Sequence, residues 1–346
     1  MQIRADNLSM ERLSADKGRY LTMRYFFRKL TWFIIAVFMA LVINFILPRL
    51  MPGDPASVLI HQLGSLDPAS QTAIRAAFGV DTDQSLLQQF VTYLASLFQG
   101  NLGISISHYP AKVSTVLAKS IPWTIGLVGI ATIMSFLIGT VLGVEIAWKR
   151  DKFWSSGILG TFLFIRSFPF FWFGLVLVYF FSFKNPIFPL GGGADFHITQ
   201  RKSWEFIKSV TYHGFLPGMT IALTSLGYWL LLMRNNMFNV LAEDYITVAH
   251  AKGLSTRRIK YSYAARNAII PSVTGFAMQL GFVVGGRLMT EMVFSYPGVG
   301  FMLYQAVQQR DYPLIQGIFL FISLAVLLAN FIADVLIIAL DPRIRR

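Results

Sequence analysis

Apolar residues gather in six long runs along the chain, and stretches rich in polar and charged residues separate them. Because a helix rises about 1.5 Å per residue, about 20 apolar residues cross a hydrocarbon core roughly 30 Å thick. Each run is predicted to be a transmembrane helix, since lipid offers the backbone no hydrogen-bond partner and the alternating pattern of a membrane barrel is absent. The runs are Leu30–Leu47, Ile121–Trp148, Gly157–Phe183, Phe215–Met233, Ile269–Met292 and Leu314–Leu340.

The third run is the least regular of the six. Arg166 and Pro169 lie inside it, and a proline removes a backbone donor and clashes with the preceding helical turn. The pattern therefore leaves two structures open for this run, a kinked span or a broken one.

The composition supports a membrane protein. Of the 346 residues, 55% are hydrophobic and 14% are charged, whereas soluble domains carry about 25% charged residues. We interpret the first run as a retained anchor, because about 29 residues precede it and no small-residue cleavage pattern follows it. The chain has no cysteine, which excludes disulfides, thiolate metal sites and cysteine nucleophiles.

The distribution of lysine and arginine predicts the orientation. With the N-terminus in the cytoplasm, 19 basic residues fall on inner segments and 9 on outer segments, as the positive-inside rule requires. The formal charge of +13 is thereby explained by topology, and no nucleic-acid partner is expected. We expect a cytoplasmic tail (1–29), a six-helix transmembrane domain (30–340) and a cytoplasmic C-terminal tail (341–346).

The predicted outer segments contain short helices and turns. In the outer loop 48–120, Asp67 and Pro68 are typical of a helix start, Gly79 is a plausible stop, and apolar residues at helical spacing predict a helix over 86–98 that covers the outer face. In 184–214, the glycines at 191–193 lack the Gly-Lys-Ser/Thr ending of a phosphate loop, so turn chemistry is preferred.

Small residues recur every fourth position in the second run, at Ala131, Ser135, Gly139 and Gly143. Gly281 and Gly285 have the same spacing in the fifth run. Small residues on one helix face let two backbones approach closely in lipid. The spacing predicts that the spans pack into a bundle.

The inner loop 241–266 is too polar to span and too regular to be a plain linker. Glu243 and Asp244 favour a helix start, the stretch through Lys252 favours a helix, and Gly253 is a natural stop. Residues 256–266 then predict a second, basic helix. From the residues alone, the segment is either a projection that fits a cytoplasmic socket or an amphipathic helix on anionic lipid.

Several strings along the chain occur together in one order. They read MPGDP at 51–55, GNLGIS at 100–105, IPWT at 121–124, FSYPGVG at 294–300, RDYP at 310–313 and LDPRIR at 340–345. With the loop 241–266, they resemble bacterial ABC-importer permeases of the dipeptide, oligopeptide and nickel branch, over nearly all of the chain from about Arg24. The chain departs from the broader Glu-Ala-Ala signature at Thr247, Val248 and Ala249, where the acidic residue is absent.

The resemblance implies an all-α membrane protein of type I importer architecture in the bacterial inner membrane. It implies one of two paired permease subunits, usually non-identical, with two ATPase subunits on the cytoplasmic face and an external substrate-binding protein. ATP and magnesium would be held by the partner ATPase and no cofactor by this chain, which has no Gly-x-x-x-x-Gly-Lys-Ser/Thr loop and is predicted not to be an enzyme.

The resemblance also assigns the loop 241–266 to coupling with the ATPase. The coupling residues it indicates are Val248, Ala249, His250, Ala251, Lys252, Gly253 and Leu254. We expect Ala249 and Gly253 to keep the tip narrow. Lys252 either pairs with an acid on the ATPase or is solvated surface.

Ionisable residues inside spans are functional candidates by default. Arg287 and Glu291 are four residues apart in the fifth run, which predicts a pair on one helix face that gates the pathway, contacts substrate or stabilises the bundle. Met278 and Gln279 are further pathway candidates. Arg166 and Asp334 could pair with each other, and Asn44 and Asn330 are predicted to join helices.

Other function classes find little support. The five histidines have no metal-ligand spacing, no Gly-x-Ser-x-Gly elbow occurs, and neither a catalytic nor a metal site is predicted. A secondary transporter driven by an ion gradient is the rival class, although no internal repeat is visible. Among substrates, peptides come first, and oligosaccharides or nickel complexes are the alternatives.

Overall fold

The computed structural model describes residues 27–47, 49–50, 55–64, 67–77, 85–198, 203–283 and 287–340. In this part of the chain, helices are joined by turns and loops, and the one β-bridge pairs Ile104 with Lys112. Among the described residues, four helices are long and apolar enough to cross a membrane. They are the helix Phe27–Leu47, α5 (Val113–Trp148), α8 (Trp204–Leu241) and α15 (Tyr312–Leu340). The all-α membrane fold is confirmed.

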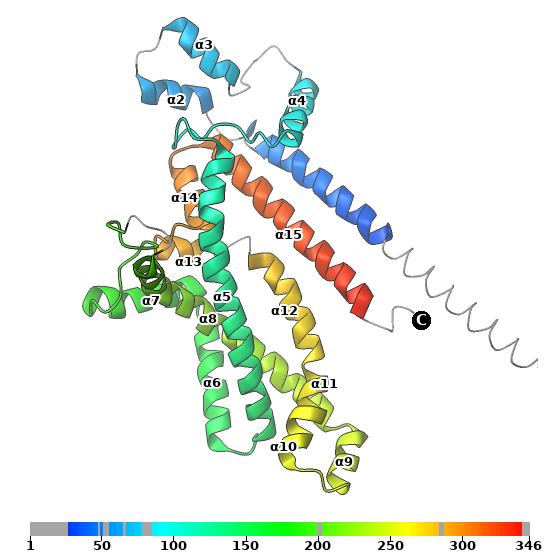
Figure 1. Cartoon of the computed structure of the whole chain (residues 1–346). Helices are drawn as coiled ribbons and strands as arrows, with labels where there is room; N and C mark the ends of the chain where they lie inside the picture. Colours follow the sequence, from blue (N-terminus) through cyan, green and yellow to red (C-terminus); the bar gives the residue numbers. More distant parts are fainter. Residues whose placement is uncertain are drawn as a thin grey trace, which may run out of the picture.

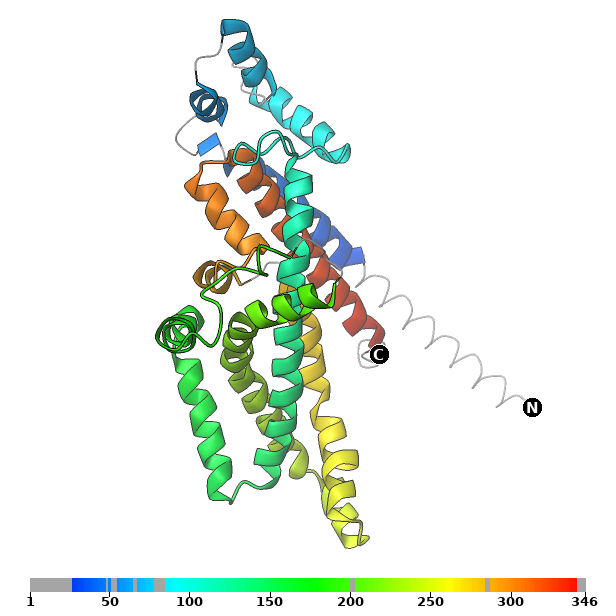
Figure 2. The ribbon, with the colours of Figure 1, turned by 60° about the vertical axis from the view of Figure 1, so that its left-hand side comes forward.

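The third apolar run is broken. It forms α6 (Phe153–Ser167), α7 (Phe170–Val178) and the π-helical turn η1 (Tyr179–Lys184), and the chain bends by 97° between α6 and α7. Pro169 lies at the bend as the N-cap of α7, where its missing donor and fixed φ start a helix rather than continue one. Figure 2 shows α7 nearly end-on beside the upright α6.

The fifth apolar run is interrupted, so the prediction of one continuous helix over Ile269–Met292 is wrong. It forms α12 (Ile270–Phe282) and α13 (Leu288–Val293), and residues 284–286 between them lie outside the described residues. The sequence has two consecutive glycines here, at 285 and 286. Arg287, just before α13, has non-helical backbone angles, and the hydrophobicity of the run does not reveal this interruption.

The outer segment contains α2 (Pro55–Leu63), α3 (Pro68–Ala77) and α4 (Leu86–Phe98). The predicted cap is confirmed, because an Asp67 carboxylate oxygen accepts a hydrogen bond from the Ser70 backbone N–H at 3.3 Å. Hydrogen bonding to Ser70 lowers the pKa of Asp67. A reciprocal Ser85–Gln88 capping box starts α4, while the predicted stop at Gly79 lies outside the described residues.

The small-residue stripe forms the seam between α5 and α8. A Cβ added to Gly139 would lie 2.7 Å from the Trp229 Cβ, and one added to Gly143 would lie 2.7 Å from the Leu230 carbonyl oxygen. Both distances are too short for a side chain, so the glycines allow the close approach of the two helices. The predicted packing role of the stripe in the second run is confirmed, whereas Gly285 of the fifth run lies outside the described residues.

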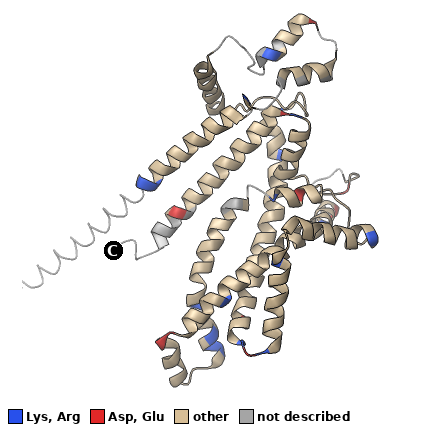
Figure 3. Ribbon diagram, turned by 180° about the vertical axis from the view of Figure 1, so that it is seen from behind, with Lys and Arg blue, Asp and Glu red and all other residues tan. Residues whose placement is uncertain are grey.

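The two predicted sides of the membrane correspond to opposite ends of the molecule. Helices α2, α3 and α4 lie at one end, and α9 (Asp244–Ala251) and α10 (Thr256–Arg258) lie at the other (Figure 1). Most of the bundle carries uncharged residues, and lysines and arginines gather near the loops that join its helices (Figure 3). The tails 1–26 and 341–346 lie outside the described residues, so the location of the termini stays a prediction.

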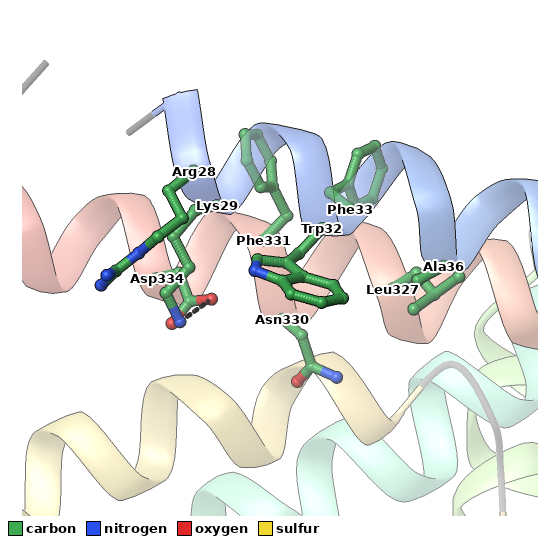
Figure 4. Close-up of a pocket in the computed structure, with 9 residues that line it drawn as sticks. All are labelled: Arg28, Lys29, Trp32, Phe33, Ala36, Leu327, Asn330, Phe331 and Asp334. Atoms are coloured by element: carbon green, nitrogen blue, oxygen red, sulfur yellow. Dashed lines mark ion pairs between the residues drawn. The ribbon is translucent and has the colours of Figure 1, made fainter. Parts of the chain in front are cut away.

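The helix Phe27–Leu47 lies along α15. The Asn44 side-chain amide donates to the Gln316 backbone oxygen at 3.1 Å and to the Tyr93 hydroxyl at 3.0 Å, which confirms Asn44 as a residue that joins helices. Nearer the N-terminus, Lys29 and Asp334 form an ion pair of 2.9 Å on the wall of a cavity of about 500 Å³. Figure 4 shows this pair and Asn330, which lines the same cavity.

Asp334 therefore pairs with Lys29 and not with Arg166, so that suggested pairing is wrong. Arg166 lies instead over the ring of Tyr228, with its guanidinium carbon 5.6 Å from the ring centroid. The sequence does not reveal which base pairs with Asp334. Asp334 and Arg166 both lie within long apolar runs, and the sequence does not show which runs pack together.

Candidate functional site

The loop 241–266 forms a short helix that projects from the bundle. Helix α9 begins after Glu243, with Asp244 in its first turn, as the charges predicted. It ends at Ala251, and Gly253 adopts a left-handed φ of 68°. The Gly253 N–H donates to the His250 carbonyl and the Leu254 N–H to the Ala249 carbonyl, which is the Schellman ending that glycine favours.

The two faces of α9 have different surroundings. Val248 is 49% exposed, and His250, Ala251, Lys252 and Gly253 are exposed with it. Ala249 is 3% exposed and faces the bundle, so it supports the projection from within and does not narrow its tip. An added Cβ at Gly253 would meet no atom within 4 Å, so backbone conformation rather than space requires glycine there.

The inner face of α9 packs on the ends of two long helices. Ile246 and Ala249 belong to one apolar cluster with residues of α5, of α8 and of the segment that follows α9. That segment comprises α10, the π-helical turn η2 (Ile259–Ala265) and α11 (Arg266–Ala268). The cluster members from the other elements are Val144, Ala147, Met233, Met237, Ile259, Ala264 and Ala268. Helix α9 is therefore packed on the ends of α5 and α8.

A polar contact joins the same elements. Glu145 on α5 forms an ion pair with Lys260 of η2, and the Tyr261 hydroxyl donates to the same carboxylate at 2.6 Å. The Lys260 side chain is 9% exposed and that of Glu145 is 24% exposed. Because Lys260 is largely removed from water, loss of one partner would leave a charge without compensation, which costs more than breaking a surface pair.

The predicted pathway residues on α12 are accessible. Met278 is 40% exposed, and Gln279 is half-buried one position further along. Their assignment to the pathway stays a prediction.

The predicted Arg287–Glu291 pair does not form. Arg287 precedes α13 with non-helical backbone angles, so the two residues do not share one helix face. The Arg287 guanidinium donates to the Ser225 hydroxyl of α8 at 3.2 Å, whereas Glu291 is fully buried elsewhere. The four-residue spacing was misleading because Arg287 is the N-cap residue of α13 and its backbone angles are not helical.

Glu291 joins α5, α13 and α14 (Val299–Gln308). One carboxylate oxygen accepts from the Thr124 hydroxyl at 2.9 Å, and the other accepts from the Gly300 N–H at 2.7 Å. Thr124 in turn accepts the Val299 N–H at 2.7 Å. The buried carboxylate thus satisfies the free N–H groups at the start of α14, and an added Cβ at Gly298 would clash with it.

A second buried carboxylate, Asp311, organises the neighbouring junction. Its oxygens accept from the Leu314 N–H at 3.1 Å, which caps α15, and from the Ser107 N–H and hydroxyl at 2.8 and 2.6 Å. The Ser105 hydroxyl donates to the same group at 2.5 Å. Two distant strings, GNLGIS and RDYP, therefore meet at one side chain.

Comparison with known proteins matches two parts of the chain to the same kind of transport protein. Residues 135–346 match the family of binding-protein-dependent transport system inner membrane components, and residues 22–127 match the N-terminal region of such membrane components. The chain belongs to this family.

Named relatives cover nearly the whole of this permease. It is 33% identical to the di/tripeptide transport system permease protein DppB of Pseudomonas aeruginosa, over 92% of this chain and 97% of the relative. It is 31% identical to the dipeptide permease DppB of Escherichia coli and 30% identical to the oligopeptide permease AppB of Bacillus subtilis, in each case over 88% of this chain and 93% of the relative. The permease is therefore a bacterial inner-membrane protein.

Sequence reasoning missed the partners of the buried charges. Thr124, Asp311 and Ser225 received no role of their own, although Thr124 and Asp311 stand in the strings that carried the resemblance. A buried hydroxyl opposite a carboxylate leaves no periodic signal in the sequence. Within the described residues, no group of three or more histidine, aspartate or glutamate side chains could hold a metal ion.

Proposed function

We propose that this permease is one subunit of an ATP-driven peptide importer, forms half of the substrate pathway and couples to a cytoplasmic ATPase through the loop 241–266. The observation that carries the proposal is the projecting helix α9, with an exposed outer face and an inner face packed on α5 and α8. Coupling needs both features, because the ATPase must bind the exposed face of α9 while the packed face transmits the movement to the spans.

The energy source lies outside the chain in this proposal. The sequence has no Gly-x-x-x-x-Gly-Lys-Ser/Thr loop, so two ATPase subunits on the cytoplasmic side would bind ATP and magnesium. Family membership supports a second permease subunit, which we propose to be a non-identical chain, and an external binding protein that delivers the substrate. Closure of the ATPases would rock the bundle between inward-open and outward-open states.

Peptides are the proposed substrate class. The named relatives carry dipeptides, tripeptides or oligopeptides according to their names. Oligosaccharides and nickel complexes are the alternatives for the same architecture.

Two substitutions at Gly253 test the coupling role. Gly253→Trp places a large side chain at the exposed tip of the projection, whereas Gly253→Ala imposes the same strained φ of 68° without bulk. In vesicles that contain the complete transporter, we expect Gly253→Trp to lower ATP-dependent peptide uptake about tenfold or more and Gly253→Ala to lower it less than about twofold.

Surface lysines provide the matched control. Lys252 and Lys152 are both exposed, but Lys252 belongs to the projection and Lys152 is the N-cap of α6. A substitution of Lys152 is therefore the control for the same substitution of Lys252. Normal uptake by Gly253→Trp would refute the coupling role of α9. Uptake that persists after ATP depletion and collapses with the proton gradient would instead support a secondary transporter.

A further inference from the structure

The two interrupted spans lie next to each other in the structure, because α7 contacts α13. One break lies between Ser167 of α6 and Phe170 of α7, and the other precedes Leu288 of α13. Helices α7 and α13 pack against each other, and they lie side by side in Figures 1 and 2. Non-helical backbone is tolerated within a membrane where it is covered by protein or lines a cavity, and in transporters it marks binding sites.

Arg287 lies where the breaks meet. Its guanidinium carbon is 5.5 Å from the ring centroid of Phe170, the first residue of α7, and one nitrogen donates to the Ser225 hydroxyl. A guanidinium has five N–H donors. Within the described residues, Ser225 is its hydrogen-bond acceptor and no carboxylate lies within 4.0 Å of it.

Arg166 approaches the same face of α8 from the other break. It lies in the last turn of α6, over the ring of Tyr228. Tyr228 and Ser225 are three residues apart on α8, which places them on one helix face about one turn apart. In the described part of the chain, Arg166 also forms no ion pair with a carboxylate.

The other charged residues within the six apolar runs are Glu145, Glu291 and Asp334, and each of them is paired or serves as a cap. Lys260 pairs with Glu145 and Lys29 pairs with Asp334, while Glu291 caps α14. A cation within a membrane is costly when it has no partner. The acid nearest to Arg287 along the sequence is Glu291, which instead accepts hydrogen bonds from Thr124 and from the start of α14. The two arginines therefore offer donors that the fold itself does not use.

We propose that Arg287 and Arg166 form a binding station for a carboxylate of the transported solute, on the face of α8 that carries Ser225 and Tyr228. The inference rests on the proposed function and assigns the C-terminal carboxylate of a short peptide as the ligand. The fork of a guanidinium matches the two oxygens of a carboxylate. Arg287 is half-buried, so its guanidinium is accessible to a solute.

The test compares trialanine with trialanine amide in vesicles that contain the complete transporter. We expect Arg287→Gln to lower trialanine uptake about tenfold and to change amide uptake less than about twofold. Arg287→Lys keeps the charge without the fork and is expected to lie between wild type and Arg287→Gln. Arg166→Gln is expected to have a smaller effect in the same direction, since Arg166 is exposed.

The control is Arg234→Gln. Arg234 also lies on α8 and also stacks on an aromatic ring, with its guanidinium carbon 4.4 Å from the Phe238 centroid, but it is remote from both breaks in sequence. We expect this variant to leave the ratio of trialanine to amide uptake unchanged. A third peptide, with an amidated C-terminus and a glutamate side chain, tests whether the station accepts an acidic side chain instead.

If both Arg287 variants lost uptake of trialanine and of its amide equally, the proposed binding station would be refuted. A selective loss with the glutamate peptide alone would overturn the assignment to the C-terminal carboxylate. The ratio of the two uptake rates does not depend on the energy source. A failure of the ATP-driven coupling would therefore appear in the ATP dependence of wild-type uptake and not in this ratio.

Discussion

At the scale of single residues, buried polar side chains hold the outer junctions together. Thr124 both donates to Glu291 and accepts the Val299 N–H, so one hydroxyl joins α5 to the start of α14. Glu291 and Val299, the two partners of this hydroxyl, are fully buried. Removing the hydroxyl would leave two buried polar groups without one of their partners, which costs more than the hydrogen bonds themselves contribute.

Thr124→Val removes this hydroxyl with little change of shape. We expect it to lower the free energy of unfolding by about 2 kcal/mol, measured by denaturant titration of the purified protein in detergent micelles. Thr124→Ser keeps the hydroxyl and is expected to lower it by less than about 1 kcal/mol. Similar losses in the two variants would show that packing of the methyl group, and not the hydrogen bonds, matters at this position.

At the scale of elements, the ion pair between Glu145 and Lys260 connects the end of α5 to η2. A second lysine, Lys149, lies near the same carboxylate at 3.9 Å, but its side chain is 50% exposed. The two lysines therefore differ in burial and contact distance while they share one partner. This difference allows a matched comparison of a buried pair with an exposed one.

Lys260→Met is expected to lower the free energy of unfolding by about 2 kcal/mol, because it leaves Glu145 partly buried without its close cation. Lys149→Met is expected to change it by less than about 0.5 kcal/mol, since exposed pairs are screened by water and salt. The measurement is again denaturant titration in detergent micelles. Equal effects of the two substitutions would argue against a special role for the buried pair.

The break between α12 and α13 is the element that the sequence pattern concealed. Both pieces are apolar, so hydrophobicity reads continuously from Ile269 to Met292. The break redirects Arg287 to Ser225 and Phe170, and it leaves Glu291 to cap α14. The argument from the four-residue spacing of Arg287 and Glu291 fails because Arg287 is the N-cap of α13 and is not itself helical.

At the scale of the whole molecule, the outer helices and the coupling loop lie at opposite ends (Figure 1). The chain contains no cysteine, so a single introduced cysteine reports its own location. Leu87 on α4 is 73% exposed, and Val248 on α9 is 49% exposed. These positions probe the predicted outer and inner faces.

In intact spheroplasts, we expect a membrane-impermeant thiol reagent to label Leu87→Cys and not Val248→Cys. Both variants are expected to be labelled after permeabilisation, because only then does the reagent reach the cytoplasmic face. Met134→Cys, at a 49% exposed apolar position within the predicted span of α5, is the control and is expected to stay unlabelled in both conditions. Labelling of Val248→Cys in intact spheroplasts would contradict the predicted orientation.

The sequence by itself determined the membrane class, the approximate positions of the long helices apart from the fifth run, an irregularity near Pro169, the end of α9 at Gly253 and the close packing at Gly139 and Gly143. Each of these follows from local hydrophobicity, backbone preference or side-chain size, which a short stretch of residues fixes. The residue types of the candidate site were also visible, since charges within apolar runs stand out.

Only the tertiary structure decided which of these groups meet. Lys29 forms an ion pair with Asp334, and Lys260 forms one with Glu145. The Thr124 hydroxyl donates to Glu291. Each of these contacts joins residues more than 100 positions apart. The choice depends on how the spans pack and rotate against one another, and a change of one helical turn would exchange the partners. Local sequence fixes the preferences of each segment, but only packing brings distant side chains within hydrogen-bonding distance.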